Sequence, residues 1–256
     1  MIDRDAFYVG YHPMAPEPVA RRTRIIVAAL AALVVATAVV LALSMRPAGP
    51  GIFEYGHPRT YRGVVSEFPY PSLLVPGHSP ADRDEAYTRY LLVAQGKHGG
   101  GPLVRGMDGR WVDLAGTRIA RPDGEMLEIV PDGVRLAADS VSTASRYLPP
   151  IEQLGRETLS GEIVDSKCWL GVMKPATGNV HRGCGARCVH GGIPPFLMTT
   201  GPEGAVQHYL LTDAQGRAAP AWFAGLVSRR VTLTGEVSLE VGLRVMRVET
   251  ATVNWP

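Results

Sequence analysis

Five side chains that bind metals or act as nucleophiles gather between residues 168 and 190 of this chain. They are Cys168, His181, Cys184, Cys188 and His190, and they include all 3 cysteines. On a helix over residues 181–190, Cys184 and Cys188 share one face, which His181 joins from three residues upstream. Thiolates and imidazoles are good ligands for copper or zinc, and three sulfurs with one histidine complete a tetrahedral site. The segment therefore predicts a metal or redox centre that uses these residues.

The same cysteines have a second interpretation, a disulfide. In an oxidising compartment two of the three would pair and leave one free thiol. Cys184 and Cys188 can pair across adjacent helical turns, and Cys168 can pair with either of them. We keep this alternative open beside the metal centre.

A catalytic cysteine is a weaker interpretation of this segment. Cys184 and His181 are suitable as nucleophile and base, but the only acid near them in sequence is Asp165. The Cys-x3-Cys spacing also differs from the Cys-x-x-Cys of thiol-disulfide enzymes. We therefore name no catalytic residue, and the sequence favours a non-enzymatic role over an enzyme without deciding between them.

A long apolar stretch over residues 25–45 predicts a membrane helix. It contains 21 residues without a charge, which as a helix span about 31 Å, close to the hydrocarbon core of a bilayer. Arg21, Arg22 and Arg24 precede it and only Arg46 follows closely, so the segment before the helix is expected in the cytoplasm. The stretch is longer than the apolar region of a cleaved signal peptide. The expectation is a single-pass signal anchor in a bacterial inner membrane, with the C-terminal part periplasmic.

The exported part contains an internal repeat. Three apolar segments recur with the same separations of 22 and 10 residues: residues 90–93, 112–116 and 126–129 in the first copy, and residues 209–212, 231–235 and 245–248 in the second. Short apolar runs bounded by glycine and proline are typical of strands. Each copy therefore predicts a small closed or nearly closed β-barrel. An immunoglobulin-like sandwich is the alternative, but each copy contains few strands for it.

The second copy resembles the OB-like β-barrel domains of bacterial membrane-anchored exported proteins. An opening strand of the form Gly-x-(Ile/Val)-x-Asp-Ser-x-Cys, residues 161–168, is followed by Cys184, Cys188 and a Tyr-x-Leu strand at residues 209–211. The cysteine spacing is Cys-x15-Cys-x3-Cys. This resemblance implies a mainly β fold with an N-terminal transmembrane helix and two tandem OB-like barrels. The group has no established activity, so the resemblance implies no function.

These observations together predict a domain organisation. The expected parts are a cytoplasmic tail (1–24), a transmembrane helix (25–45), a first barrel (46–132), a linker (133–157) and a second barrel with a Cys/His insertion (158–256). The insertion is expected because 48 residues separate Gly161 from Tyr209, whereas 27 separate Gly63 from Tyr90. Long loops on rigid scaffolds often carry function.

Two functions from different classes fit this organisation. The first is electron transfer or metal delivery to a membrane complex by a Cys/His site. The second is a disulfide-stabilised accessory or assembly subunit that binds a membrane protein without metal. Nucleic acid is not expected as a partner, because residues 46–256 contain 22 basic and 21 acidic residues and therefore no basic surface to attract phosphate.

Overall fold

The computed structural model describes residues 14–44, 51–77, 87–138, 150–201 and 204–253. The chain divides into an N-terminal unit, residues 1–47, and a compact C-terminal unit, residues 48–256. The N-terminal unit supplies a single described helix. The C-terminal unit contains the strands, the remaining helical segments and all the cysteines.

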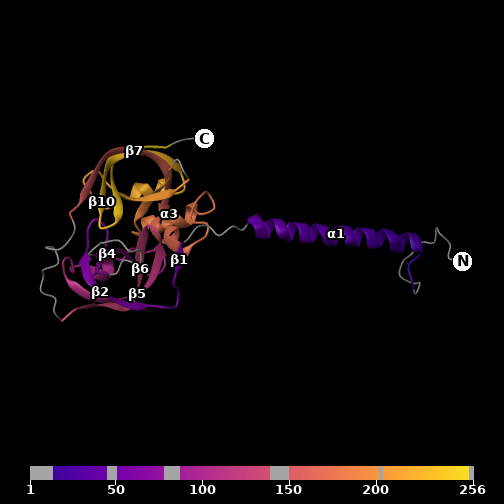
Figure 1. Ribbon diagram of the computed structural model, residues 1–256, viewed down its shortest axis with the longest axis horizontal. Helices are drawn as coiled ribbons and strands as arrows, with labels where there is room; N and C mark the ends of the chain where they lie inside the picture. The colour runs from indigo at the N-terminus through magenta and orange to yellow at the C-terminus, as the bar shows by residue number, and fades with distance from the viewer. Residues whose placement is uncertain (1–13, 45–50, 78–86, 139–149, 202–203, 254–256) are drawn as a thin grey trace. The chain divides into compact units, whose positions relative to one another are not determined.

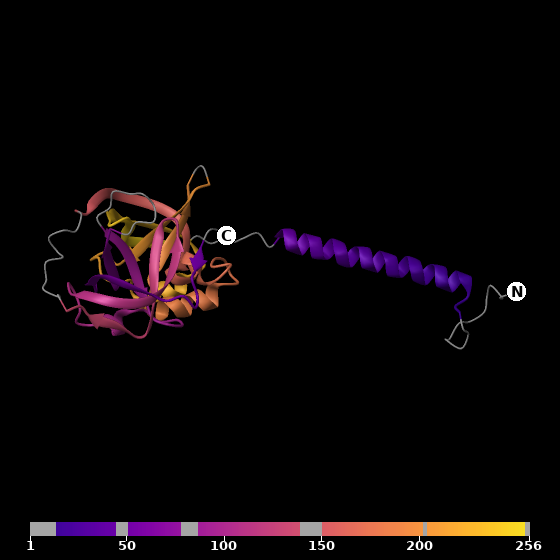
Figure 2. The ribbon, with the colours of Figure 1, turned by 60° about the horizontal axis from the view of Figure 1, so that its bottom comes forward.

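Helix α1 (Glu17–Ser44) is continuous in both views in which it is seen from the side (Figures 1 and 2). Its 28 residues span about 42 Å at a rise of about 1.5 Å per residue. The helix is long and apolar enough to cross a membrane, and none of its residues is buried. The helix predicted over residues 25–45 is thus confirmed as far as Ser44, and residue 45 lies outside the described residues. It starts earlier than the apolar stretch because Pro18 is tolerated in a first turn. Both a membrane anchor and a signal sequence fit these properties.

The C-terminal unit is mainly β, as predicted, and contains two sheets. The first sheet consists of β1 (Ile52–Phe53), β2 (Arg59–Ser66), β3 (Ser72–Pro76), β4 (Tyr87–Val93), β5 (Trp111–Arg121) and β6 (Gly124–Leu136). The second consists of β7 (Glu152–Asp165), β8 (Pro195–Thr200), β9 (Val206–Thr212), β10 (Arg230–Glu240) and β11 (Leu243–Val253). The helical segments are α2 (Gly101–Val104), η2 (Cys168–Val172), α3 (Arg182–His190) and η3 (Ala221–Leu226).

The two sheets have the same cyclic order of strand pairing. The second is a closed barrel in the order β10-β11-β9-β8-β7. In the first, β5-β6-β4-β3-β2 pair in that order, β2 pairs with β5 to close the ring, and β1 is added alongside β5. Each ring has one parallel pair, in which Leu91 of β4 faces Met126 of β6, and Leu210 of β9 faces Val245 of β11.

The long hairpin of each ring has its register shift beside a glycine. Gly116 faces Ile129 in β5–β6, and Gly235 faces Val248 in β10–β11. A Cβ on Gly235 would lie 1.9 Å from the carbonyl oxygen of Arg247, so only glycine allows the strands to approach there. Glycine is a common residue at such bulges.

The β5–β6 hairpin and β7 extend further into the predicted linker than the sequence indicates. The β5–β6 pairing continues to Val112 and Leu136, and β7 already begins at Glu152. Both ends of the linker predicted over residues 133–157 are therefore strand, because the strands keep pairing past the bulge. Residues 139–149 of that linker lie outside the described residues.

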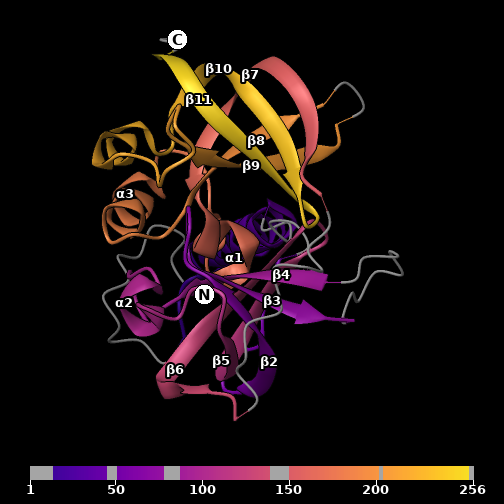
Figure 3. The ribbon, with the colours of Figure 1, turned by 90° about the vertical axis from the view of Figure 1, so that its left-hand side faces the viewer.

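The connection between β7 and β8 contains η2 and α3, whereas the corresponding connection between β2 and β3 is a short turn. Leu170 of η2 packs in one hydrophobic core with Ile119 and Met126 from the first sheet and with Phe196 and Leu210 from the second. Figure 3 shows the two sheets on opposite sides of this region, with α3 beside the second. The insertion thus joins both sheets through a shared core.

Candidate metal centre

The chain brings the cysteines together at the point where β7 ends and the insertion begins. Cys168 opens η2 directly after β7, and Cys184 and Cys188 lie on consecutive turns of α3. The helix predicted over residues 181–190 is confirmed by α3, with His181 immediately before its first residue. At the other end of the insertion the backbone N–H of Ser166 donates to the carbonyl of Pro194, 3.0 Å away. The insertion therefore starts and ends at one place on the barrel.

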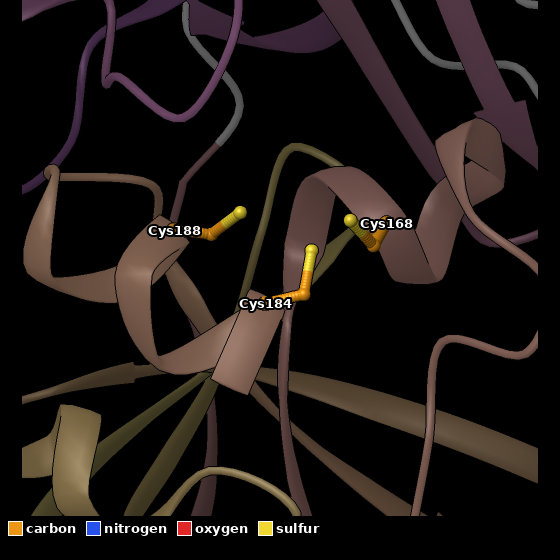
Figure 4. A group of neighbouring side chains, drawn as sticks. All are labelled: Cys168, Cys184 and Cys188. Atoms are coloured by element: carbon orange, nitrogen blue, oxygen red, sulfur yellow. The ribbon is translucent and has the colours of Figure 1, made fainter. Parts of the chain in front are cut away.

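The three cysteine sulfurs converge on one point. Their Sγ atoms all lie within 4.8 Å of one another, and Figure 4 shows the side chains pointing toward a common space between η2 and α3. Cys168 and Cys188 are buried, Cys184 is half-buried, and all three are free thiols. Three sulfur donors thus stand within reach of one metal ion, largely shielded from water.

Asp165 and His181 form a buried pair beside the sulfurs. Asp165 Oδ2 lies 2.8 Å from His181 Nε2, and Asp165 Oδ1 accepts the backbone N–H of Cys168 at 2.9 Å. Ligand atoms of Asp165, Cys168 and His181 also lie within 4.8 Å of one another. The pair places a negative carboxylate and an imidazole against the sulfur cluster.

Gly185 lets α3 approach this pair closely. A Cβ at Gly185 would lie 2.8 Å from the side chain of Val227 and 3.1 Å from Asp165 Oδ2. A larger residue would push the helix, and with it Cys184 and Cys188, away from Cys168. The glycine between the two helical cysteines therefore has a packing role.

His190, the other histidine predicted as a ligand, does not reach the cluster. It is the last residue of α3 and is exposed, and it belongs to neither group of neighbouring ligand atoms found among the described residues. Two residues after Cys188 a helix has turned by about 200°. The side chain of His190 therefore points away from the face that carries the two cysteines.

Lys97 is a site residue that the sequence reasoning missed. It lies after β4 of the first sheet, and its Nζ is 2.7 Å from the Sγ of Cys184 and 3.9 Å from that of Cys188. No local pattern connects residues so far apart in the chain. The one available signal was composition: the chain has 3 lysines among 26 basic residues, and two of the three are found here.

The second of these lysines, Lys167, fixes the loop that carries Lys97. Its Nζ donates to the carbonyls of Ala94, 2.9 Å, and Gly96, 2.7 Å, and forms an ion pair with Glu128. The Lys167 side chain is 3% exposed, so these contacts satisfy a buried ammonium group. Burial without such partners would be strongly unfavourable.

The far end of the same loop is held by α3. The backbone N–H of Gly99 donates to the carbonyl of Gly191 at 2.9 Å. A Cβ on Gly191 would lie 1.9 Å from the carbonyl oxygen of Lys97, so the two backbones are in direct contact. We refer to residues 94–99 as the clasp loop, because they close over the sulfur cluster from the first sheet.

Hydrogen bonding distributes the charge unevenly among the sulfurs. The hydrogen bond between Cys168 and Cys188 raises the pKa of the Cys168 thiol, and burial and the charge of Asp165 act in the same direction. The same bond lowers the pKa of Cys188, with help from the positive charges of Lys97 and Lys167 and against the effect of burial. The hydrogen bond to Cys184 raises the pKa of Lys97, which keeps its ammonium form. Cys188 is thus the better thiolate of this pair.

Comparison with known proteins gives no match: no family model, no curated protein and no solved structure is similar to the chain. The site itself is therefore the basis for a functional inference. Its components are three convergent sulfurs, a buried carboxylate–imidazole pair and an ammonium group supplied by the clasp loop.

Proposed function

We propose that this chain is a membrane-anchored, extracytoplasmic protein that binds copper or zinc through Cys168, Cys184 and Cys188. The carrying observation is that the three Sγ atoms lie within 4.8 Å of one another. Metal–thiolate bonds are about 2.3 Å long, so three sulfurs around one ion lie about 4 Å apart. Small side-chain rotations are enough to bring the free thiols to that spacing.

The donor set supports a soft metal ion. Thiolates select copper(I) and zinc over hard cations such as magnesium or calcium. His181 is the nearest further ligand, and a buried carboxylate holds its ring at 2.8 Å, as carboxylates commonly do for metal-binding histidines. The exposed His190 is not part of this ligand set. Copper would suit electron transfer, and either ion would suit delivery to a membrane complex.

The charges around the site support cation binding as well. Three thiolates and Asp165 would gather several negative charges in a place where Cys168, Cys188 and Asp165 are almost fully buried. Buried charge of one sign is unfavourable unless opposite charge balances it. Lys97 provides one positive charge next to Cys184, and a metal cation would balance most of the rest.

The membrane location rests on α1 and its arginines. The helix is long enough to cross a bilayer, and Arg21, Arg22 and Arg24 lie in its N-terminal turns. Positive residues at that end favour a cytoplasmic N-terminus and an exported C-terminal unit. Arg46, on the other flank of the apolar stretch, lies outside the described residues.

We further infer that the C-terminal unit is a duplicated pair of OB-like barrels. Support comes from the common cyclic pairing order, the equivalent parallel strand pairs and the bulge glycines at Gly116 and Gly235. In OB folds the loop after the first strand often contacts ligands. The cysteine-bearing insertion occupies that connection of the second ring.

Metal analysis of the full-length chain in detergent tests this proposal. The chain is reduced without oxygen, incubated separately with zinc and copper(I), dialysed and analysed for bound metal. The expected result is one ion per chain, lost when Cys168, Cys184 or Cys188 is replaced by serine and kept in His190→Ala. Retention of no metal by the reduced chain would overturn the proposal.

The alternative to a metal site is a disulfide between Cys168 and Cys188. Their Sγ atoms already lie within 4.8 Å of each other. Oxidation of the pair would produce the stabilised accessory subunit, with Cys184 as the remaining thiol. Alkylation under denaturing conditions would then detect one free thiol and no bound metal.

A further inference from the structure

Lys97 of the clasp loop and Cys184 of α3 are in close contact at the sulfur cluster. Their Nζ and Sγ atoms are 2.7 Å apart. N–H···O hydrogen bonds are most often about 2.9–3.0 Å long, and sulfur is larger than oxygen. The nitrogen and the sulfur are therefore closer than an ordinary hydrogen bond to sulfur requires. An oxygen atom bonded to both the nitrogen and the sulfur would hold these two atoms at about this separation.

Both partners are held in this position by backbone contacts. Lys167 binds the carbonyls of Ala94 and Gly96 on one side of Lys97, and Gly99 is bound to Gly191 on the other. Cys184 lies in the first half of α3, whose end is in contact with the clasp loop. The backbone contacts therefore hold Lys97 and Cys184 near each other, so the proximity of Nζ and Sγ does not depend on the two side chains alone.

Exposure also singles out Cys184. It is the half-buried member of the cluster, whereas Cys168 and Cys188 are buried, and Lys97 is itself partly exposed. A small oxidant from solvent therefore meets Cys184 first. Oxidation of cysteine depends on access as well as on thiolate character, and Cys184 has the best access of the three.

We propose that Lys97 and Cys184 form a redox modification site, at which dioxygen links Nζ to Sγ through a single oxygen atom. The neutral amine and thiol together hold the same atoms as an ammonium–thiolate pair, so the reaction is balanced for the neutral groups. The S–H bond and one N–H bond break, and an N–O and an O–S bond form. The second oxygen atom leaves as water with the two hydrogens. Sulfur and nitrogen each lose two electrons, and dioxygen gains four.

The link is reversible and changes what the cluster can bind. Its sulfur is at the level of a sulfenic acid, which thiols reduce, and two molecules of a dithiol would return the amine, the thiol and water. In the linked form Cys184 can no longer act as a thiolate ligand. Insofar as this consequence rests on the proposed metal centre, oxidation at Lys97–Cys184 releases the ion. Formation of the link itself needs no metal.

Mass spectrometry of the full-length chain, stripped of metal, tests the inference. After reduction and exposure to air we expect the chain to gain about 14 Da, from one oxygen gained and two hydrogens lost. Dithiothreitol reverses the gain. Trypsin no longer cleaves after Lys97, so residues 90–105 are recovered joined to residues 183–187. The gain disappears in Lys97→Arg and Cys184→Ser and persists in Cys188→Ser and in Lys174→Arg, the variant of an exposed lysine elsewhere in the insertion.

Three results would overturn the inference, and none depends on whether metal is bound. They are an unchanged mass, a loss of about 2 Da from a disulfide, and a gain of about 16 Da that Lys97→Arg retains, which is a sulfenic acid without the lysine. Metal retention by the reduced, oxygen-free chain is measured separately. A chain that binds no metal but still gains the link refutes the metal centre alone, and the opposite outcome refutes the link alone.

Discussion

The carboxylate of Asp165 lies 2.8 Å from the imidazole Nε2 of His181, and this contact ties the end of β7 to the start of α3. Its other oxygen accepts the backbone N–H of Cys168. One buried side chain thus fixes both segments that carry the sulfurs. Its removal would affect the site without touching any cysteine.

We expect Asp165→Ala to lower the free energy of unfolding by roughly 2–6 kcal/mol, because two buried donors lose their acceptor and each costs about 1–3 kcal/mol. Asp165→Asn should cost less, since its amide oxygen still accepts from Cys168. Urea denaturation measures both, with Asp113→Asn, at a half-buried position of β5, as the control. Equal stability of Asp165→Ala and the wild type would show that the contact does not hold the insertion.

The contact between the clasp loop and α3 leaves no space for a methyl group at Gly191. Gly191→Ala would place Cβ 1.9 Å from the carbonyl oxygen of Lys97, so the loop must move and uncover Cys184. We expect faster alkylation of Cys184 by iodoacetamide in the folded chain. Gly183→Ala, within α3 and with nothing outside the helix within 4 Å of its Cβ, should leave the rate unchanged. An equal rate in both variants would contradict the role of the loop as a cover.

Tyr70 connects the two sheets through its hydroxyl group. The hydroxyl donates to the carbonyl of Leu211 at 3.0 Å and accepts the backbone N–H of Ala219 at 2.7 Å. Tyr70→Phe removes this hydrogen-bond partner from both groups, so we expect a loss of about 2 kcal/mol in the free energy of unfolding. Tyr55→Phe, at a ring that is 77% exposed, should change it by less than about 0.5 kcal/mol. Thermal or urea denaturation of both variants tests whether the free energy of unfolding changes as expected.

His208 predicts a dependence of stability on acid. Burial lowers its pKa from 6.5 to about 4, with the positive charges of Arg121 and Arg244 acting in the same direction and Asp123 opposing them. Above pH 6.5 the histidine is neutral in both states. Between pH 6.5 and 4 the unfolded chain binds a proton that the folded chain does not, so stability falls by on the order of 3 kcal/mol.

The measurement for His208 is urea denaturation at pH 7.5, 5.5 and 4. We expect His208→Gln to be less stable than the wild type at pH 7.5, because the ring stacks on Phe196 with centroids 4.7 Å apart. The difference between the two proteins should shrink as the pH falls. A constant difference across this range would mean that His208 titrates normally in the folded chain.

Short-range patterns predicted much of this fold and part of this site. The spacing of Cys184 and Cys188 fixed their common helical face, and His181 followed from the same periodicity. His190 was grouped with them as well, but a position two residues after Cys188 lies on another face of the helix, and the structure does not bring His190 to the cluster. His190 is close to Cys188 in the sequence, which suggested that their side chains converge, but the rotation of the helix between them points the two side chains in different directions.

The rest of the site depends on contacts that no local pattern encodes. Lys97 reaches Cys184 across 87 residues, and it does so only because Lys167 and Gly191 fix the clasp loop. A Gly-rich stretch after Lys97 gave no reason to connect it with the cysteines. Such partners are set by the packing of one sheet on the other, which a sequence pattern does not specify.

The shared core around η2 has a consequence for how the C-terminal unit can be divided. Leu170 fills a space bounded by residues of both rings, among them Met126 and Phe196. A chain cut between β6 and β7 would therefore give two fragments that each expose an apolar face, and neither fragment would be an independently folding domain. The two rings are therefore mutually dependent halves of one cooperative unit.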